Sequence, residues 1–448
     1  MFMSRGKSPV WFMDARARSS ADSLENKAKR LFDEAGLAKC FDPGNRVAIK
    51  IHWGEMWNTS YLRPNLVRAI VDRIKDCGGE PFVTEGTSLG YMSARGTGYD
   101  YLSTAAAHGY TAETMGCPVI MTDGWMGTDD VEVLVSRGKM LKKTFVAKPI
   151  ARADAAIIVS HWKGHTQGGF GGAIKNLGVG CVSKRGKYLL HAGADFEETP
   201  TVNAALCAGK SCGFSDYCQS ICYTGAIRIS DKGLEYDPDK CIYCSAGCIC
   251  ASLGKKAVDR PQKVVNGLVY QERVQTRFTD NALAVVNTVG KDRVGFINYM
   301  IDVTPACDCA TSSDTPMIQN IGVFASRDPL AIDQACYDAM VKATGLPDSR
   351  AEGMGPGVDK LTKIHGFDVT VQLKVGEEIE LGNRGYDLNT LDSLTNESMT
   401  AIWPWKNRAS IYQRFVEVDH PLKPLLPESH PIRIRFDERA KKMAKGKD

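Results

Sequence analysis

The sequence lacks any long hydrophobic run. Its 448 residues contain no stretch that approaches the roughly 18 consecutive apolar residues of a transmembrane helix. The start of the sequence turns polar too soon for a secretory signal, so we expect a soluble, cytoplasmic protein. Hydrophobic residues make up 43% of the chain and charged residues 24%, which excludes a disordered or fibrous protein. The length predicts about three domains, or two large ones.

Excess positive charge is absent from almost all of the chain. The net charge of +4 is carried by residues 433–448, which include seven Lys or Arg and three Asp or Glu. A basic tail can contact nucleic acid or acidic lipid, but it is more often a solvated end. No nucleic-acid-binding motif accompanies this tail, so nucleic acid is a disfavoured partner.

Cysteine, by contrast, is abundant, with 15 residues, of which seven fall between Cys212 and Cys250. Without a secretory signal, disulfides are disfavoured, and metal or redox chemistry is the better interpretation. Most of the other cysteines are scattered singly, as buried structural thiols usually are.

The cysteine-rich segment resembles a two-cluster bacterial ferredoxin. Such proteins carry the run C-x2-C-x2-C-x3-C-P, whose fourth cysteine ligates the other cluster. Cys212, Cys218 and Cys222 match the first, third and fourth positions, and Ser215 stands at the second. The second half opens with a regular C-x2-C and then departs from the spacing by one residue at each later position; its cysteines are Cys241, Cys244, Cys248 and Cys250.

Crossed ligation between the halves predicts one complete four-thiolate site, from Cys222, Cys241, Cys244 and Cys248. The second set, Cys212, Cys218 and Cys250, lacks one thiolate, which Ser215, Cys207 or a water could replace. We therefore predict one 4Fe-4S cluster and leave open a second, which could also be a three-iron cluster or absent. Zinc is the alternative for C-x2-C pairs, but it does not explain the interleaved spacing.

Strands alternate with helical patterns along most of the remaining chain. Short apolar runs at residues 47–51, 82–84 and 156–160 alternate with helical patterns, and the alternation resumes near residue 280. This order predicts an α/β fold with a mainly parallel sheet and flanking helices. We predict an α/β domain in residues 1–206 and 257–374, a ferredoxin-like 4Fe-4S insertion at 207–256, and an irregular C-terminal extension with a basic tail at 375–448.

Ligands of open parallel sheets bind beyond the carboxyl ends of the strands. Five predicted loops carry titratable or ligand-type residues at this edge; they begin at residues 52, 85, 161, 302 and 327. Four of the residues at or after these strand ends are candidate catalytic groups for an acidic substrate: Lys50, His161, His165 and Lys175. The alternatives are solvated lysines and structural histidines.

A glycine-rich turn follows in the third loop, and we predict that it binds a ligand through Gly168, Gly169, Gly171, Gly172 and Asn176. Backbone N–H groups in such a turn can hold an anion. The pattern is neither G-x-G-x-x-G nor a Walker A loop, so it predicts no nucleotide, and the alternative is a packing turn. In the fourth loop, Cys307 and Cys309 could ligate metal, react, or be ordinary thiols.

Together these loops resemble the domain of unknown function 362 family over about residues 8–345. The residues that carry the resemblance are Lys50, Glu85-Gly86, His165, Gly171 to Gly178, Cys307-Asp-Cys309 and Gly322 to Pro329. Members of that family often carry a ferredoxin-like insertion between the Lys-Asn-Leu-Gly and Cys-Asp-Cys loops. The resemblance implies an iron–sulfur protein of anaerobic metabolism, and it leaves the reaction open. It does not cover the extension after about residue 375.

These features predict an iron–sulfur redox protein, either an oxidoreductase or the electron-transferring subunit of one. An anionic ligand would bind in the crevice of the α/β domain, between the loops that follow the strands. The partners that this implies are a redox protein and a small anionic molecule, and a homo-oligomer is left open. One alternative is a non-redox lyase or metal-handling protein with structural clusters. Another is a pure electron-transfer protein with an empty crevice.

Overall fold

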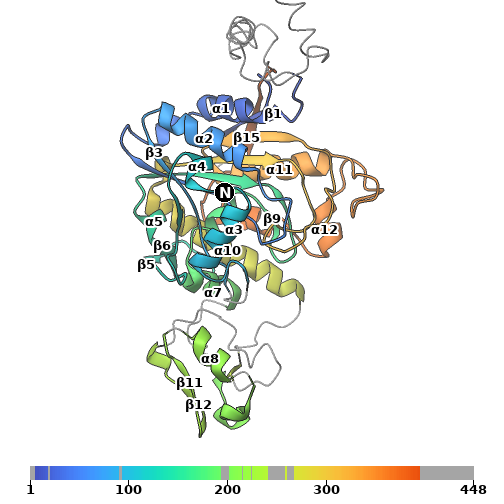
Figure 1. The fold of residues 1–448 in the computed structure, drawn as a ribbon. Helices are drawn as coiled ribbons and strands as arrows, with labels where there is room; N and C mark the ends of the chain where they lie inside the picture. Colours follow the sequence, from blue (N-terminus) through green and yellow to red (C-terminus); the bar gives the residue numbers. More distant parts are fainter. Residues whose placement is uncertain are drawn as a thin grey trace, which may run out of the picture. The chain divides into compact units, whose positions relative to one another are not determined.

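A computed structural model describes residues 6–18, 21–89, 93–192, 201–213, 215–222, 224–240, 258–259 and 267–393 of the chain (Figure 1). The chain divides into two compact units, residues 1–15 with 24–391 and residues 16–23 with 392–448. The sheet, the core and the candidate site belong to the first unit. The predicted basic tail at residues 433–448 lies outside the described residues.

An eight-stranded sheet forms the centre of the first unit, in the order β16-β1-β15-β14-β7-β2-β3-β4. Its strands are β1 (Ser8–Asp14), β2 (Arg46–Lys50), β3 (Glu80–Glu85), β4 (Val119–Met121), β7 (Ala155–His161), β14 (Val294–Met300), β15 (Gly322–Ser326) and β16 (Tyr386–Thr390). Neighbouring strands are parallel, except that β15 runs antiparallel to both β1 and β14. The predicted α/β fold with a mainly parallel sheet is confirmed.

Helices cover both faces of this sheet, so its central strands are buried on both sides. All seven residues of β7 and all seven of β14 are buried, which explains their nearly continuous apolar sequences. Ile49 and Ile157 pack with α1 (Leu24–Glu34) and α2 (Pro64–Asp76). Ala48 and Ile158 pack on the opposite face with α10 (Gly267–Val289). Figure 1 shows α1 and α2 on one side of the sheet and α10 on the other.

The other helices are α3 (Gly98–Ala107), α4 (Ala112–Met115), α5 (Lys148–Ala151), α6 (Ala173–Gly178), α7 (Lys184–Ala192), α8 (Ser215–Ile221), α11 (Pro329–Lys342), α12 (Lys360–His365) and α13 (Val371–Glu378). Four two-stranded sheets pair β5 (Asp130–Leu134) with β6 (Lys143–Ala147), β8 (Lys163–His165) with β9 (Gly169–Gly171), β10 (Thr201–Val202) with β13 (Val258–Asp259), and β11 (Ile227–Ser230) with β12 (Gly233–Tyr236). Within the described ranges, no helix is long and apolar enough to cross a membrane.

Two local predictions are wrong. Residues 327–329 were expected at the same sheet edge as the other four loops, but β15 is antiparallel and places them at the opposite edge. No helix separates β14 from β15, and a parallel connection normally needs such a crossover. Residues 386–390 were expected to be irregular, but they form β16, which pairs with β1. Four of its five residues are exposed, so it lacks the apolar alternation that marks a strand.

Candidate active site at the carboxyl edge of the sheet

A cavity of about 530 Å³ opens where β2, β3 and β7 end. These strands are parallel, so the loops that follow them meet at one edge of the sheet. Five cationic and two carboxylate side chains line the cavity, together with four histidines; they are Lys50, Arg95, Lys163, Lys175, Lys187, Glu55, Glu85, His52, His161, His165 and His191. The wall therefore carries more positive than negative charge, which favours an anionic ligand.

Most of the predicted crevice residues line this one cavity. They are Lys50, His161, His165, Gly168, Gly171, Gly172, Lys175 and Asn176. Gly169 is the exception. Its backbone has a φ of +77°, and an added Cβ would lie 2.7 Å from Cβ of Val369, so this glycine is needed for packing.

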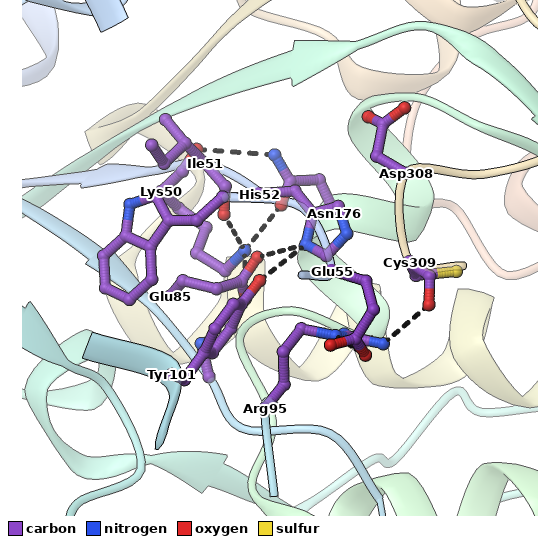
Figure 2. Close-up of polar contacts among 12 residues, drawn as sticks. Lys50, Ile51, His52, Glu55, Glu85, Arg95, Tyr101, Asn176, Asp308 and Cys309 are labelled. Atoms are coloured by element: carbon purple, nitrogen blue, oxygen red, sulfur yellow. Dashed lines mark hydrogen bonds and ion pairs between the residues drawn. The ribbon is translucent and has the colours of Figure 1, made fainter. Parts of the chain in front are cut away.

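Lys50 forms a buried network with Glu85 and His52 at the end of β2 (Figure 2). Its ammonium group donates to Oε1 of Glu85 at 2.9 Å, to the carbonyl of Ile51 at 2.7 Å, and to Oδ1 of Asn176 at 2.7 Å. All three N–H donors are thus engaged, and the side chain is fully buried. The geometry makes Lys50 a positioning residue that binds Asn176 to the sheet.

Glu85 is the anion at the centre of that network. Burial by itself would raise the pKa of Glu85, but the charge of Lys50 and the hydrogen bond with His52 outweigh it and lower the pKa to about 2. Nδ1 of His52 lies 2.9 Å from Oε2 of Glu85, and the Tyr101 hydroxyl also contacts this ring nitrogen. Nε2 of His52 has no hydrogen-bond partner among the described residues, although its ring lines the cavity.

Asp308 organises a second buried network, in the loop after β14. One carboxylate oxygen lies 2.8 Å from Nδ1 of His161 and 3.2 Å from Nζ of Lys163. Burial would raise the pKa of Asp308, yet His161 and Lys163 hold it well below its usual range. Nε2 of His161 also faces an acceptor, the carbonyl of Ile301 at 2.7 Å, so each ring nitrogen has a partner. His161 therefore supports the Asp308 loop and has no free nitrogen for a ligand.

The thiols of Cys307 and Cys309 flank Asp308. Sγ of Cys307 accepts from the backbone N–H of Cys309 at 3.3 Å and from the ammonium group of Lys175 at 3.9 Å. Burial would raise the pKa of Cys307, but the Cys309 thiol and the charges of Lys175 and Lys163 lower it well below its ordinary value. The hydrogen bond to Cys307 and burial raise the pKa of Cys309. The pair thus favours one thiolate and one thiol.

His165 completes a donor group that could hold a metal ion. One ring nitrogen of His165 and the sulfurs of Cys307 and Cys309 all lie within 4.8 Å of one another. Nδ1 of His165 already accepts from the backbone N–H groups of Gly168 at 2.8 Å and Gln167 at 3.2 Å. Burial and the nearby Lys175 lower the pKa of His165 well below its ordinary value, so the ring is neutral and carries its proton on Nε2.

The glycine turn holds an anion that belongs to the protein itself. The carboxylate of Asp333, on α11, accepts from the backbone N–H groups of Ala173 and Ile174 at 2.9 Å each. An added Cβ at Gly172 would lie 2.2 Å from Oδ1 of Asp333, so glycine is required there. The N–H groups of Ala173 and Ile174 thus bind a carboxylate that lies 160 and 159 residues away in the sequence, and the spacing of the turn gives no sign of this partner. Ligand binding at Gly168, Gly169, Gly171, Gly172 and Asn176 stays a prediction.

Lys175 and Asn176, on the short helix α6, have contrasting surroundings. The Asn176 amide donates to the carbonyl of Val159 and to Oγ of Ser160, both at 3.1 Å, so the side chain is fully engaged. For the Lys175 ammonium, the only polar contact among the described residues is Sγ of Cys307 at 3.9 Å. Lys175 is therefore the cation on this wall with the most capacity for a ligand.

The sequence-based prediction of site residues missed several members of the site. Arg95 donates to Oε2 of Glu55 and to the carbonyl of Cys309, both at 2.9 Å (Figure 2). It lies between β3 and α3, away from any strand end, so the rule of strand ends does not find it. Glu85 and Asp308 do follow strands, but nothing in the sequence shows which cations they pair with.

The described part of the cysteine-rich segment brings together three of its cysteines. Cys218 packs with Ile227 and Ile229, and Cys207 and Cys222 lie against the same apolar cluster. The backbone N–H of Ile227 donates to Sγ of Cys222 at 3.2 Å, and that of Gly209 donates to Sγ of Cys207 at 3.4 Å. Cys212 and Ser215 lie beside them in the chain, where the Ser215 N–H donates to the Cys212 carbonyl. The other predicted ligands, Cys241, Cys244, Cys248 and Cys250, lie outside the described residues.

The fold and the cavity define an α/β protein with a cationic, thiol-bearing site at the carboxyl edge of its sheet. The chain belongs to the domain of unknown function family DUF362, whose family model matches residues 47–338. This match covers the strands β3, β7, β14 and β15, all of β2 except its first residue, and all the residues of the two buried networks. No curated protein matches the chain.

Among solved structures, the chain is similar to the lactate racemase apoprotein from Thermoanaerobacterium thermosaccharolyticum, with 12% sequence identity and a TM-score of 0.30. The aligned region covers 66% of this chain and 51% of that protein, so this chain spans about half of the racemase's length.

Proposed function

We propose that this protein is an iron–sulfur redox protein of anaerobic metabolism, either an oxidoreductase or the electron-transferring subunit of one. In this proposal residues 207–256 form a ferredoxin-like insertion in the α/β domain. A 4Fe-4S cluster, when bound, supplies one-electron transfer through cysteine-ligated iron. The cavity of the α/β domain takes a small anionic ligand.

The observation that carries the iron–sulfur proposal is the environment of the described cysteines. Cys218 belongs to one small apolar cluster, Cys207 and Cys222 lie against it, and the backbone N–H of Ile227 donates to the sulfur of Cys222. Hydrogen bonds to the ligand sulfurs are among the features that tune iron–sulfur centres, so these residues fit such a group. In the proposal Cys222 joins Cys241, Cys244 and Cys248 at one cluster. Cys212, Cys218 and Cys250 form the other site.

The charge of the cavity carries the proposal of an anionic ligand. Lys175 projects its ammonium group beside Cys307 and lacks a carboxylate partner among the described residues. Lys163, by contrast, is paired with Asp308. A ligand carboxylate, phosphate or sulfate would find its charge partner in Lys175, with Arg95 and Lys187 also on the cavity wall.

A comparison of single variants tests the assignment of the cluster ligands. Because ligation crosses between the halves, Cys222→Ala and Cys244→Ala should remove the same cluster, as measured by iron content and electron paramagnetic resonance of anaerobic protein. Cys77→Ala, outside the cysteine-rich segment, is the control and should retain all the iron. If Cys222→Ala instead removes the site of Cys212 and Cys218, the halves do not interleave and the ferredoxin assignment is wrong.

The anion proposal is tested by calorimetric titration with inorganic phosphate and sulfate. Lys175→Met should abolish the heat of binding, and Lys143→Met, at a surface lysine paired with Glu132, should leave it unchanged. Equal binding by the two variants would show that the anion does not bind at this cavity.

A metal-handling function is the second candidate, because His165, Cys307 and Cys309 could hold a metal ion. It predicts zinc or another divalent metal at about one per chain, which Cys309→Ser removes while the insertion keeps its iron. Metal analysis of the wild-type protein and of Cys309→Ser therefore distinguishes the metal-handling function from the iron–sulfur redox function.

A further inference from the structure

We propose that Cys307 and Cys309 form a dithiol–disulfide redox centre on the wall of the cavity, and that its oxidant is a small anionic disulfide. The preference for an anion rests on the proposed function of the cavity. The thiol chemistry rests on the geometry of the loop after β14 and is independent of any iron–sulfur cluster.

The local backbone brings the two sulfurs to one side of a tight turn. The N–H of Ala310 donates to the carbonyl of Cys307 at 3.0 Å, which closes a β-turn with Cys309 at its third position. The two sulfurs lie within 4.8 Å of each other. A disulfide needs Cα atoms within about 7 Å, a separation that residues two apart in a turn satisfy.

The turn is anchored at each residue after Cys307. The Asp308 carboxylate is fixed by His161 and Lys163, and its carbonyl accepts from the backbone N–H of Glu55 at 2.8 Å. The Cys309 carbonyl accepts from Arg95 at 2.9 Å. The Ala310 carbonyl accepts from Asn58 at 3.0 Å. This anchoring holds the backbone in place while the sulfurs change oxidation state.

The two sulfurs differ in access and in charge. Cys307 is 3% exposed and receives hydrogen bonds from Lys175 and from the Cys309 backbone, which stabilise a thiolate. Cys309 is more exposed and lines the cavity. Cys309 can therefore meet an external disulfide first, and the sulfur of Cys307, within 4.8 Å of it, is placed to resolve the mixed disulfide.

The same charges favour thiol chemistry over metal binding. A divalent cation between the sulfurs would lie close to the ammonium group of Lys175, which is 3.9 Å from Sγ of Cys307. His165 would also have to give up two backbone hydrogen bonds or the proton on Nε2 to become a ligand.

The reaction balances with a disulfide, RSSR, as the oxidant. The Cys309 thiol first passes its proton to the neighbouring Cys307 thiolate, and the Cys309 thiolate attacks RSSR. This forms a Cys309–SR bond and expels RS⁻, which takes the proton from Cys307 and leaves as RSH. The Cys307 thiolate then attacks Sγ of Cys309 and expels RS⁻. One intramolecular S–S bond replaces that of RSSR, so the protein loses two electrons and RSSR gains them.

The test uses full-length anaerobic protein and three disulfides of different charge. The anionic probe is 3,3′-dithiodipropionate, the neutral probe 2-hydroxyethyl disulfide, and the cationic probe cystamine. After alkylation, tryptic peptide 294–327 contains Cys307 and Cys309 and no other cysteine. In mass spectrometry, the internal disulfide appears as a peptide that carries no alkyl group and is lighter by two hydrogen atoms than the reduced peptide. Peptide 328–342, which contains only Cys336, is an internal control and should remain fully alkylated.

We expect the anionic probe to oxidise peptide 294–327 at least about tenfold faster than cystamine. Lys175→Met should bring this ratio close to one. Cys307→Ser should stop the reaction at the mixed disulfide on Cys309, because the resolving sulfur is missing. Cys309→Ser should prevent the internal disulfide.

Three results would overturn the proposal: full alkylation of peptide 294–327 after exposure to every probe, a mixed disulfide in the wild-type protein that never resolves, or a metal that remains bound to these sulfurs and blocks their oxidation. Equal rates with all three probes would overturn the anionic oxidant. Iron content measured on the same samples shows separately whether the iron–sulfur proposal fails.

Discussion

The buried pair of Lys50 and Glu85 offers the most quantitative test of the site's architecture. A Glu85→Gln substitution leaves the Lys50 ammonium group fully buried without its counter-charge, although its two neutral acceptors remain. One pKa unit corresponds to about 1.4 kcal/mol, so a Glu85 pKa of about 2 in place of 4.5 corresponds to about 3 kcal/mol of stability. Loss of one partner from a buried ion pair costs about 3–5 kcal/mol. We therefore expect Glu85→Gln to lower the free energy of unfolding by at least about 3 kcal/mol.

The assay is denaturant unfolding followed by tryptophan fluorescence, because Trp53 and Trp162 are buried on opposite faces of the sheet. Glu132→Gln is the matched control. Its partner Lys143 lies 3.2 Å away, but both side chains are more than two-fifths exposed, so the loss should be below about 1 kcal/mol. The Lys50→Met/Glu85→Gln double variant should lose less stability than the two single variants added together.

The dependence of stability on pH in acid is an independent test of the pair of Lys50 and Glu85. The pKa of Glu85 is lower in the folded chain than the ordinary 4.5, so its stabilisation is present above pH 4.5 and is lost as the pH falls towards 2. Glu85→Gln should lack this part of the acid response. The reasoning is refuted if Glu85→Gln and Glu132→Gln lose equal stability at neutral pH, or if the Lys50 and Glu85 substitutions are additive.

Two further substitutions test the supports of the site by thermal unfolding. Burial raises the pKa of Asp333 to about 6, so its contribution to stability is largest below about pH 4 and is lost as the pH rises through 6. Asp333→Asn should abolish this dependence of stability on pH. The new amide would also turn a donor towards the N–H of Ala173, which should destabilise the protein by about 1–3 kcal/mol. Gly180→Ala would place its Cβ 2.2 Å from Nζ of Lys50 and should cost roughly 1–3 kcal/mol, whereas Gly355→Ala, with open space around it, should change little. If neither Asp333→Asn nor Gly180→Ala changes the thermal stability, these contacts are not formed.

Much of the architecture could be predicted, because strands that are buried on both faces have distinctive sequences. The apolar runs of β2 and β7 and the helical patterns between them indicate a parallel sheet, and the structure has one. The direction of β15 could not be predicted from its own residues, because direction depends on the connection from β14. The exposed strand β16 likewise exists through its pairing with β1.

The location of the site could be predicted better than the roles within it. The rule of strand ends correctly brings Lys50, His165 and Lys175 to one cavity. It gives no information on partners distant in sequence. The sequence therefore suggests catalytic roles for Lys50 and His161, whereas Glu85 and Asp308 engage these side chains in the structure. Burial decides whether a charged side chain is structural or available to a ligand. A fully buried charge needs a partner within the protein, whereas a charged group exposed at the cavity wall can bind a ligand.

The central claim is that the protein carries an iron–sulfur cluster, and metal and acid-labile sulfide analysis of the anaerobically purified full chain tests it most directly. The account predicts at least about four iron and four sulfide per chain, with a broad thiolate-to-iron absorption near about 400 nm that Cys222→Ala diminishes. Stoichiometric zinc with negligible sulfide would contradict it.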